Sequence, residues 1–291
     1  FNQPIAQTAH ISNILQSTVA AAERVFEFLD EKEQTKEIDR PVILTDVIGK
    51  VEFENVVFGY DTDKTIIKNL SVKIEPGHRV AIVGPTGAGK TTLVNLLMRF
   101  YEVNSGSIKI DGIDIKDMKR SDVRKLFGMV LQDTWLFNGT IRENLTYGNE
   151  NATDEEVIIA AKEAHVDHFV KSLPNGYDML LNEEASNISQ GEKQLLTIAR
   201  AMIAKTPMLI LDEATSSVDT RTEVLIQKAM DNLMKNKTSF VIAHRLSTIR
   251  DANLILVMKD GNVIEHGTHQ ELMTMNGFYA ALYNSQFESD D

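Results

Sequence analysis

A glycine-rich loop of eight residues contains the most specific chemical pattern in the sequence. Its letters, GPTGAGKT, run from Gly84 to Thr91 and fit the pattern G-x-x-x-x-G-K-[ST]. A short apolar run precedes the loop, and apolar residues at helical spacing follow it. In a strand–loop–helix setting, successive backbone N–H groups and the helix dipole are suited to surround phosphate oxygens. A glycine-rich turn that only caps a helix is the alternative, and the full match disfavours it.

Side chains at the end of this loop predict a nucleoside triphosphate site. Lys90 is placed to reach the β- and γ-phosphates, Thr91 to ligate Mg²⁺, and Thr92 to donate a hydrogen bond to the α-phosphate. The sequence therefore predicts ATP or GTP as the ligand, together with Mg²⁺. The residues assigned to the phosphates are Gly84, Pro85, Thr86, Gly87, Ala88, Gly89, Lys90, Thr91 and Thr92.

Two adjacent carboxylates follow a second apolar run, LIL at residues 209–211. Asp212 emerges at the carboxyl end of a predicted strand, where it would hold the shell of metal ligands. Glu213 is placed to orient or deprotonate the water that attacks the γ-phosphate, as general-base chemistry requires. A helix-capping acid is the alternative role for Glu213. The pair favours hydrolysis of the nucleotide.

The elements that must position these residues are predicted from hydrophobic patterns. Residues 51–60 and 66–74 alternate apolar with polar side chains, as paired antiparallel strands do. Residues 153–172 have helical periodicity and an acidic start, which predicts a helical insert. Continuous apolar runs are typical of strands buried on both faces of a parallel sheet. Such runs occupy residues 79–84, 207–212 and 239–244.

The first 48 residues differ from the rest in pattern. Residues 1–22 contain no Asp, Glu, Lys or Arg, and apolar residues recur there at helical spacing. This pattern suits a helix that packs on other helices near a membrane, and a plain helix docked on the globular part is the alternative. Charged residues from Asp30 to Arg40 predict a linker, and globular structure is expected to start near Gly49.

Composition narrows the classes of function. The 291 residues include 43% hydrophobic residues, which is enough for an ordinary core. A net charge of −12 argues against a nucleic-acid partner, because that binding depends on clustered Lys and Arg. Cysteine is absent, which excludes disulfides and thiolate metal sites. We find no signal peptide and no apolar stretch of about 18 residues, so the chain as given is expected to be soluble.

Six elements in sequence order resemble the nucleotide-binding domain of the ATP-binding cassette (ABC) family. The resemblance extends from about Val51 to Tyr283, and the order of the elements makes it specific. It implies an α/β fold of the P-loop NTPase class, with an ABC-type ATPase core, an antiparallel β subdomain at 51–74 and an α-helical subdomain at 140–174. The elements are the phosphate loop, Gln132, Ser186–Glu192, Asp212-Glu213, Ser216–Asp219 and His244.

The resemblance also implies roles for single residues. Tyr60 would stack on adenine, Asp219 would lie at the centre of a dimer, and Ser189 and Gly191 would meet the γ-phosphate held by the opposite subunit. The implied catalytic residues are Glu213, His244, Gln132 and Lys90, and the implied Mg²⁺ ligands are Thr91, Gln132 and Asp212.

More narrowly, the chain resembles exporters of the multidrug and lipid-flippase type. The similar segments are AAAERVFEFLD, QDTWLFNGTIRENL and VIAHRLSTI. This resemblance implies that residues 1–34 are the cytoplasmic end of the last transmembrane helix, 35–48 a linker and 49–291 the nucleotide-binding domain. It places the domain at the cytoplasmic face of the cell membrane. A transmembrane domain would contact the surface formed by Trp135–Asn144, Glu183 and Glu184, for which a solvated loop is the alternative.

One motif departs from the family. The usual signature is Leu-Ser-Gly-Gly-Gln, and here residues 188–192 read ISQGE. Ser189 and Glu192 still form a capping box for the following helix. The carboxylate of Glu192 in the first helical turn would weaken the attraction for a phosphate by about 0.3–1 kcal/mol. The resemblance implies that the signature acts on the partner's nucleotide. A weakening on one side only suggests a heterodimer with a different nucleotide-binding domain, and a homodimer is the alternative.

Three functions remain open at this point. The first is an ATPase that drives export through a transmembrane domain, closing head-to-tail on a second cassette around Mg²⁺-ATP. The second is a cassette ATPase that does not transport, and the lack of basic surfaces and long insertions disfavours it. The third is a regulatory module that binds ATP without turnover, which Glu213 and His244 argue against.

Overall fold

The computed structural model covers residues 1–291 and describes all of them except residues 32, 62–63, 184, 213–217, 244–245 and 288–291. Glu213 and His244, which the sequence assigns to catalysis, lie outside the described residues, as does Glu184. The chain forms two compact units, residues 1–37 and residues 38–291.

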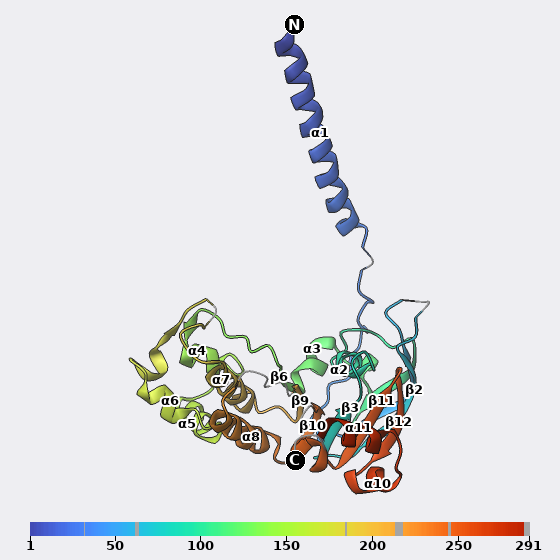
Figure 1. The fold of residues 1–291 in the computed structure, drawn as a ribbon, viewed down its shortest axis with the longest axis vertical. Coiled ribbons are helices and arrows are strands. Elements are labelled where there is room, and N and C mark those ends of the chain that lie inside the picture. Colours follow the sequence, from blue (N-terminus) through green and yellow to red (C-terminus); the bar gives the residue numbers. More distant parts are fainter. Residues whose placement is uncertain (32, 62–63, 184, 213–217, 244–245, 288–291) are drawn as a thin grey trace. The chain divides into compact units, whose positions relative to one another are not determined.

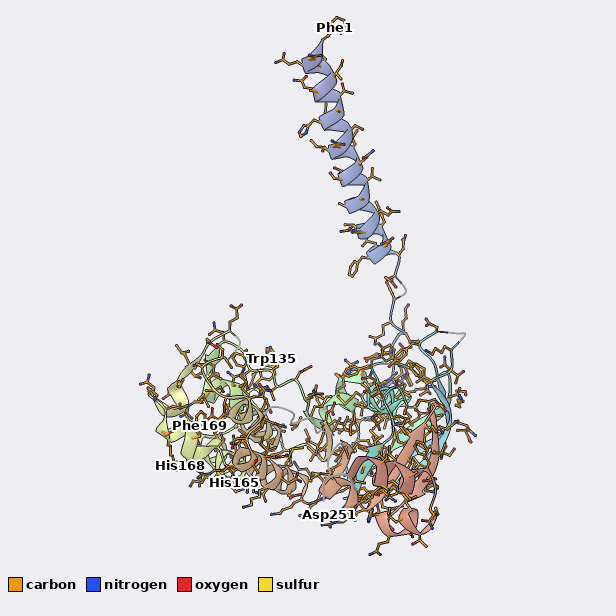
Figure 2. All side chains as sticks on the ribbon, viewed as in Figure 1. Phe1, Trp135, His165, His168, Phe169 and Asp251 are labelled. Atoms are coloured by element: carbon orange, nitrogen blue, oxygen red, sulfur yellow. The ribbon has the colours of Figure 1, made fainter. Side chains whose placement is uncertain are left out.

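The first unit contains one long helix, α1 (Asn2–Leu29), in which no residue is buried (Figure 1). The prediction of a single helix is confirmed. Its apolar side chains are exposed to solvent (Figure 2), with Leu15 at 59% and Phe26 at 61%. None of the described helices is both long and apolar enough to cross a membrane.

An antiparallel sheet opens the second unit, with strand order β2-β1-β4-β5. Val51 pairs with Ile74 on one side and with Ile110 on the other, so the first strand lies between two partners. The sequence predicted the first pair of strands, which is confirmed, but not the second pair, which a tight turn connects. The strands are β1 (Val51–Phe58), β2 (Ile67–Ile74), β4 (Ser105–Ile110) and β5 (Ile113–Asp114).

A six-stranded sheet with order β12-β11-β3-β10-β9-β6 forms the centre of the unit. All neighbouring strands are parallel except the edge pair β11 and β12. The three runs predicted to be parallel strands are the adjacent strands β3, β10 and β9, which confirms the predicted sheet. The strands are β3 (Arg79–Val83), β6 (Phe127–Val130), β9 (Met208–Asp212), β10 (Thr238–Ile242), β11 (Leu254–Lys259) and β12 (Asn262–Gly267).

Helices from the middle of the chain pack together around α7, which contacts α4, α5 and α8. The predicted insert at 153–172 is helical but divided, because His165 adopts a left-handed φ of 58° that no helix continues through. These helices are α4 (Ile141–Thr146), α5 (Asp154–Glu163), α6 (Asp167–Ser172), α7 (Gln190–Ile203) and α8 (Thr220–Met234).

Short elements complete the second unit. The α-helices are α2 (Lys90–Leu97), α3 (Arg120–Lys125), α9 (Leu246–Arg250), α10 (His269–Thr274) and α11 (Phe278–Phe287). The 3₁₀ turns are η1 (Ile115–Asp117) and η2 (Gly176–Asp178), and a two-stranded ribbon joins β7 (Gly139–Thr140) to β8 (Leu180–Leu181).

Two hydrophobic cores cover the two faces of the six-stranded sheet. Alternate residues of each strand face opposite sides, so Val80 and Ile82 join one core while Ala81 and Val83 join the other. The first core includes the antiparallel sheet and α2, and the second includes α4 to α8. Burial on both faces explains why the central strands read as continuous apolar runs.

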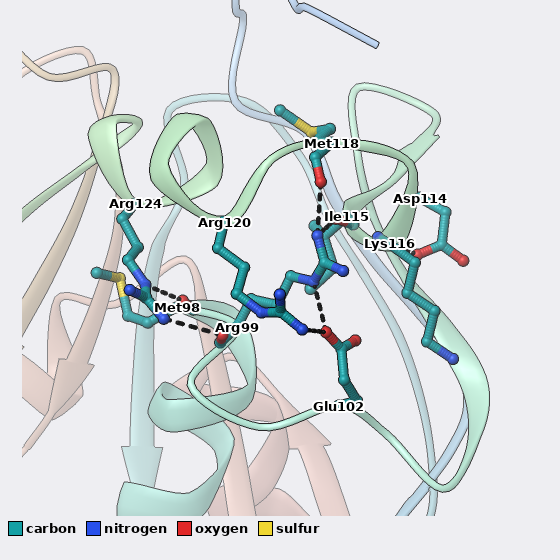
Figure 3. Close-up of polar contacts among 9 residues, drawn as sticks. All are labelled: Met98, Arg99, Glu102, Asp114, Ile115, Lys116, Met118, Arg120 and Arg124. Carbon is teal, nitrogen blue, oxygen red and sulfur yellow. Dashed lines mark hydrogen bonds and ion pairs between the residues drawn. The ribbon is translucent and has the colours of Figure 1, made fainter. Parts of the chain in front are cut away.

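A cluster of arginines fixes the chain directly after α2 (Figure 3). Arg99 has a φ of 49° and a side chain that is only 4% exposed. Its guanidinium donates to Glu102 Oε1 at 2.9 Å and to the carbonyl oxygens of Ile115 and Met118 at 2.9 and 2.6 Å. Arg120, with a side chain 7% exposed, donates to the same Glu102 oxygen at 2.8 Å. One carboxylate therefore joins two buried cations.

Replacing Glu102 by Gln tests how much this cluster contributes to the stability of the fold. The change removes the charge that Arg99 and Arg120 share and keeps the side-chain volume. We expect the free energy of unfolding to fall by about 2–3 kcal/mol, below the usual cost for a fully buried pair because Glu102 is partly exposed. Urea denaturation measures this free energy of unfolding. Lys125→Ala, which breaks an exposed pair with Asp122, is the control and should leave stability near the parent value. Equal effects of the two changes would contradict the interpretation.

Candidate nucleotide-binding site

The glycine-rich loop connects β3 to α2 at the carboxyl edge of the parallel sheet. Gly84 must be glycine, because a Cβ atom there would lie 2.2 Å from the carbonyl oxygen of Met258 on β11. Gly89 precedes α2 with a left-handed φ of 101°. The first N–H groups of a helix have no acceptor within the helix, so those of α2 are directed toward the loop. The residues that the sequence assigns to a phosphate loop thus lie between a parallel strand and a helix start, a setting that suits an anion.

A cavity of about 420 Å³ lies beside this loop. Residues from three separate strand ends meet there: the loop after β3, Gln132 after β6, and Asp212 at the end of β9. The parallel strands bring them together because their carboxyl ends share one edge of the sheet. The lining residues are Ile66, Thr86, Gly87, Gly89, Lys90, Thr91, Thr92, Gln132, Asp212 and Ile242.

Lys90 supplies the positive charge of the cavity. Its Nζ atom donates to the carbonyl oxygens of Gly84 at 2.7 Å and of Pro85 at 3.0 Å. Burial lowers the pKa of Lys90, and the negative charge of Asp212 opposes that shift. The ammonium therefore lies over the loop, next to a carboxylate, where an anionic group would be attracted to it.

The predicted metal ligands also fit the ion. Thr91, Gln132 and Asp212 all line the cavity and provide a hydroxyl, an amide and a carboxylate oxygen. Mg²⁺ prefers oxygen ligands and is usually held by one or two carboxylates together with phosphates of the substrate. No cluster of three or more His, Cys, Asp or Glu residues suited to a metal occurs in the described part of the chain, and a Mg²⁺–phosphate site of this kind does not require one.

Tyr60 lies at the end of β1 and points its hydroxyl toward α2. The hydroxyl lies 3.4 Å from Thr92 Oγ1, and Asn95 Nδ2 donates to it at 3.4 Å. The side chain is 45% exposed. Tyr60 therefore contacts a residue that lines the cavity, Thr92, but does not itself line it. Nothing in the sequence pattern marks Asn95, which looks like any polar residue in an apolar helix.

The signature residues Ser189 and Gly191 lie outside this cavity, at the start of α7. Ser189 caps α7: its Oγ accepts from the Glu192 N–H at 3.3 Å, and the carboxylate of Glu192 accepts from the Ser189 N–H at 2.8 Å. The predicted capping box is therefore present. A Cβ atom on Gly191 would lie 2.4 Å from Thr222 Cγ2, so Gly191 permits close packing of α7 on α8. Ser189 and Gly191 do not line the cavity around Lys90.

Asp219 caps the next helix, α8. Its Oδ1 atom accepts from the backbone N–H groups of Arg221 at 3.1 Å and Thr222 at 3.0 Å. Hydrogen bonding by Thr222, first from its backbone N–H, lowers the pKa of Asp219. Like the signature residues, Asp219 does not line the cavity.

The segment Trp135–Asn144, which the sequence predicts to contact a transmembrane domain, is partly buried. Trp135 is 58% exposed, and its ring lies 5.9 Å from that of Tyr147, which is 61% exposed. Asn144, however, is fully buried: it donates to the carbonyl oxygens of Phe137 and Thr140, and its side-chain oxygen accepts from Arg200. The expectation of a surface running through Asn144 is therefore wrong at that residue, because its carboxamide satisfies backbone groups of the loop. Hydrophobic patterns do not reveal such internal partners.

A family model described as ABC transporter matches residues 67–216. The chain is 57% identical over 279 residues to the "Fatty acid ABC transporter ATP-binding/permease protein" of Mycobacterium tuberculosis, covering 96% of the chain and 44% of that protein. It is 46% identical over 283 residues to the "ATP-dependent lipid A-core flippase" of Desulfotalea psychrophila, covering 97% of the chain and 49% of that protein.

A solved structure of an ABC exporter is also similar to this chain. The "Structure of a bacterial Atm1-family ABC exporter with ATP bound" superposes with a TM-score of 0.82 at 42% sequence identity, over 94% of this chain and 48% of that chain. The chain thus spans about half the length of the relatives that it matches.

Removing the cap of α7 tests how the signature segment is held. Ser189→Ala deletes the acceptor for the Glu192 N–H, and we expect the free energy of unfolding to fall by about 1 kcal/mol. Ser189→Asp keeps an acceptor at the cap and is expected to stay within a few tenths of a kcal/mol of the parent. Urea denaturation monitored by circular dichroism compares the three proteins. A loss in the Asp variant equal to that in the Ala variant would exclude capping as the cause.

Proposed function

The chain belongs to the ABC transporter family, and we propose that it binds Mg²⁺-ATP and hydrolyses it to drive export through a transmembrane domain. One observation carries the proposal. A single cavity is lined by Lys90 and Thr91 of the phosphate loop, by Gln132 and by Asp212. The loop follows β3, Gln132 follows β6, and Asp212 ends β9, so three parallel strands contribute to the cavity. A cationic side chain, helix N–H groups and hard oxygen ligands are the set that phosphoryl transfer requires.

The proposed reaction is in-line attack of water on the γ-phosphate. The bond between the γ-phosphorus and the bridging oxygen breaks, ADP leaves, and Glu213 orients the water and accepts its proton. Mg²⁺ bound by Thr91, Gln132 and Asp212 would neutralise charge on the phosphates. Lys90 would stabilise the negative charge that develops on the β- and γ-phosphates, and His244 would donate a hydrogen bond to the γ-phosphate. Tyr60 would stack on the adenine.

We further propose that the cavity is completed by a second nucleotide-binding domain. Ser189, Gly191 and Asp219 lie away from the cavity of their own chain, at the starts of α7 and α8. A head-to-tail arrangement would give these helix starts to the nucleotide of the partner, where their positive dipole ends suit a phosphate. The altered signature would then act on the partner's site, which supports a heterodimer, with a homodimer as the second arrangement.

The transmembrane partner is proposed from two exposed surfaces. On α1, apolar side chains such as Leu15 and Phe26 are exposed along a helix that belongs to a separate unit. In the second unit, the rings of Trp135, Phe137 and Tyr147 lie within 6 Å of one another, and Trp135 and Tyr147 are exposed. We assign residues 1–34 to the end of a transmembrane helix, 35–48 to a linker and 49–291 to the nucleotide-binding domain, placed at the cytoplasmic face of the membrane.

Glu213→Gln tests the assigned base. Without a carboxylate to take the proton, hydrolysis is expected to fall at least 100-fold, while Mg²⁺-ATP still binds and holds two domains together. Phosphate release measures turnover, and gel filtration with Mg²⁺-ATP measures the dimer. Glu155→Gln, a change in the exposed first turn of α5, is the control and should behave like the parent. Hydrolysis at the parent rate by Glu213→Gln would refute the assignment.

Glu192→Gln tests the proposed effect of the signature on the partner's nucleotide. Glutamine also serves at this position of a capping box, so the helix start should be kept while one negative charge is removed. We expect ATP-dependent association to tighten by about 2- to 5-fold, which corresponds to ~0.3–1 kcal/mol at a helix N-terminus. Analytical ultracentrifugation with Mg²⁺-ATP measures it. Weaker association by a variant that unfolds at the parent's urea midpoint would contradict the electrostatic argument.

A further inference from the structure

Three aromatic rings meet around Tyr60, whose hydroxyl contacts the cavity-lining residue Thr92. The ring centroid of Tyr60 lies 4.8 Å from that of Tyr101 and 5.0 Å from that of Phe58, at interplanar angles of 81° and 84°. The centroids of Phe58 and Tyr101 lie 5.7 Å apart. Such nearly perpendicular packing is the preferred arrangement for aromatic pairs. Tyr101 comes from the turn after α2, whereas Phe58 and Tyr60 come from β1 and its end.

The polar contacts of Tyr60 alone hold it weakly. Its hydroxyl makes two long hydrogen bonds, both 3.4 Å, to Thr92 and Asn95. Bonds of this length lie at the outer limit of hydrogen-bond geometry and restrict a ring little. The plane of the Tyr60 ring must therefore be set mainly by Phe58 and Tyr101. With 45% of the side chain exposed, ring surface remains for another planar group.

Tyr101 belongs to a turn whose neighbouring residues are held by charged side chains. It lies between Arg99 and Glu102, which the buried arginine cluster joins (Figure 3). Arg124 donates to the carbonyl oxygens of Met98 and Arg99 at 3.3 Å, and its guanidinium lies 4.8 Å from the ring centroid of Phe100. The turn that carries Tyr101 is thus held mainly by the charged hydrogen bond between Arg99 and Glu102, since charged hydrogen bonds are stronger than neutral ones.

We propose that Tyr101 is a positioning residue for the nucleotide base: it holds the ring of Tyr60 in the plane on which adenine stacks. The inference rests on the proposed function and assigns the support of that stacking to a residue outside the phosphate loop. Tyr101 acts through Tyr60, so its loss lowers affinity for the base and leaves the phosphate contacts of Lys90 and Thr91 unchanged.

The test compares ligands with and without a base. Titration calorimetry on residues 1–291 measures the affinity of each protein for Mg²⁺-ATP and for Mg²⁺-tripolyphosphate. Tyr101→Ala is expected to weaken ATP binding by about 3- to 10-fold, the range that corresponds to one aromatic pair, and to leave tripolyphosphate binding unchanged. Tyr101→Phe keeps the ring and should bind ATP within about 2-fold of the parent. Tyr177→Ala, at a tyrosine that hydrogen-bonds Asp167 and does not line the cavity, is the matched control and should bind ATP like the parent.

A double-mutant cycle shows whether Tyr101 acts through Tyr60. In a Tyr60→Ala background, adding Tyr101→Ala is expected to change ATP affinity no further. If Tyr101→Ala lowers the melting temperature, the ATP affinity is measured again with Tyr101→Leu, which fills the same space without an aromatic ring.

The outcomes separate this inference from the proposed function. Failure of the parent to bind Mg²⁺-ATP, or an unchanged ATP affinity in Tyr60→Ala, would overturn the proposed site. If Tyr60→Ala weakens ATP binding while Tyr101→Ala does not, the inference alone is overturned. The same holds if Tyr101→Ala weakens ATP and tripolyphosphate equally, because that result would indicate general damage to the site.

Discussion

Burial of both faces of one parallel sheet is the constraint on which the site depends. Two separate cores cover β3, β9 and β10, so polar side chains on these strands are tolerated only at the strand ends. Because the strands are parallel, their carboxyl ends share one edge, and the residues that emerge there are brought together whatever their separation in sequence. Lys90 and Asp212 meet in one cavity for this reason, although 121 positions lie between them.

The antiparallel sheet has a second role beyond covering one face. Its core side chains, such as Val51 and Phe53, join the cluster that contains Val80 and Ile82 of the parallel sheet. The end of β1 is therefore fixed relative to the phosphate loop, which lets Tyr60 contact Thr92 on α2. A hydrophobic core thus sets the distance between the phosphate end and the proposed base end of the site.

Local patterns predicted the parts of the fold that depend on neighbours in sequence. The phosphate loop, the strands at 79–83 and 208–212 and the capping box of α7 all have motifs that a short window reveals. The arginine cluster was not predicted, because Arg99 adopts a positive φ unusual for arginine and bonds carbonyls at Ile115 and Met118. Tyr101 was missed likewise, since its contact with Tyr60 depends on two elements that meet only after folding. Glu213 and His244 stay predictions, as do the assigned roles at the cavity.

The altered signature shows how folding and function make different demands on one residue. The fold needs an acceptor at Glu192 for the Ser189 N–H, a bond of 2.8 Å in this structure. Glutamine would satisfy that demand equally, because either side chain completes a capping box. The negative charge is therefore not required by the helix. We propose that the charge acts on a group that meets the start of α7 from outside, where it would oppose the dipole that attracts a phosphate. The proposed partner site is consequently the place where this departure from the family would have its effect.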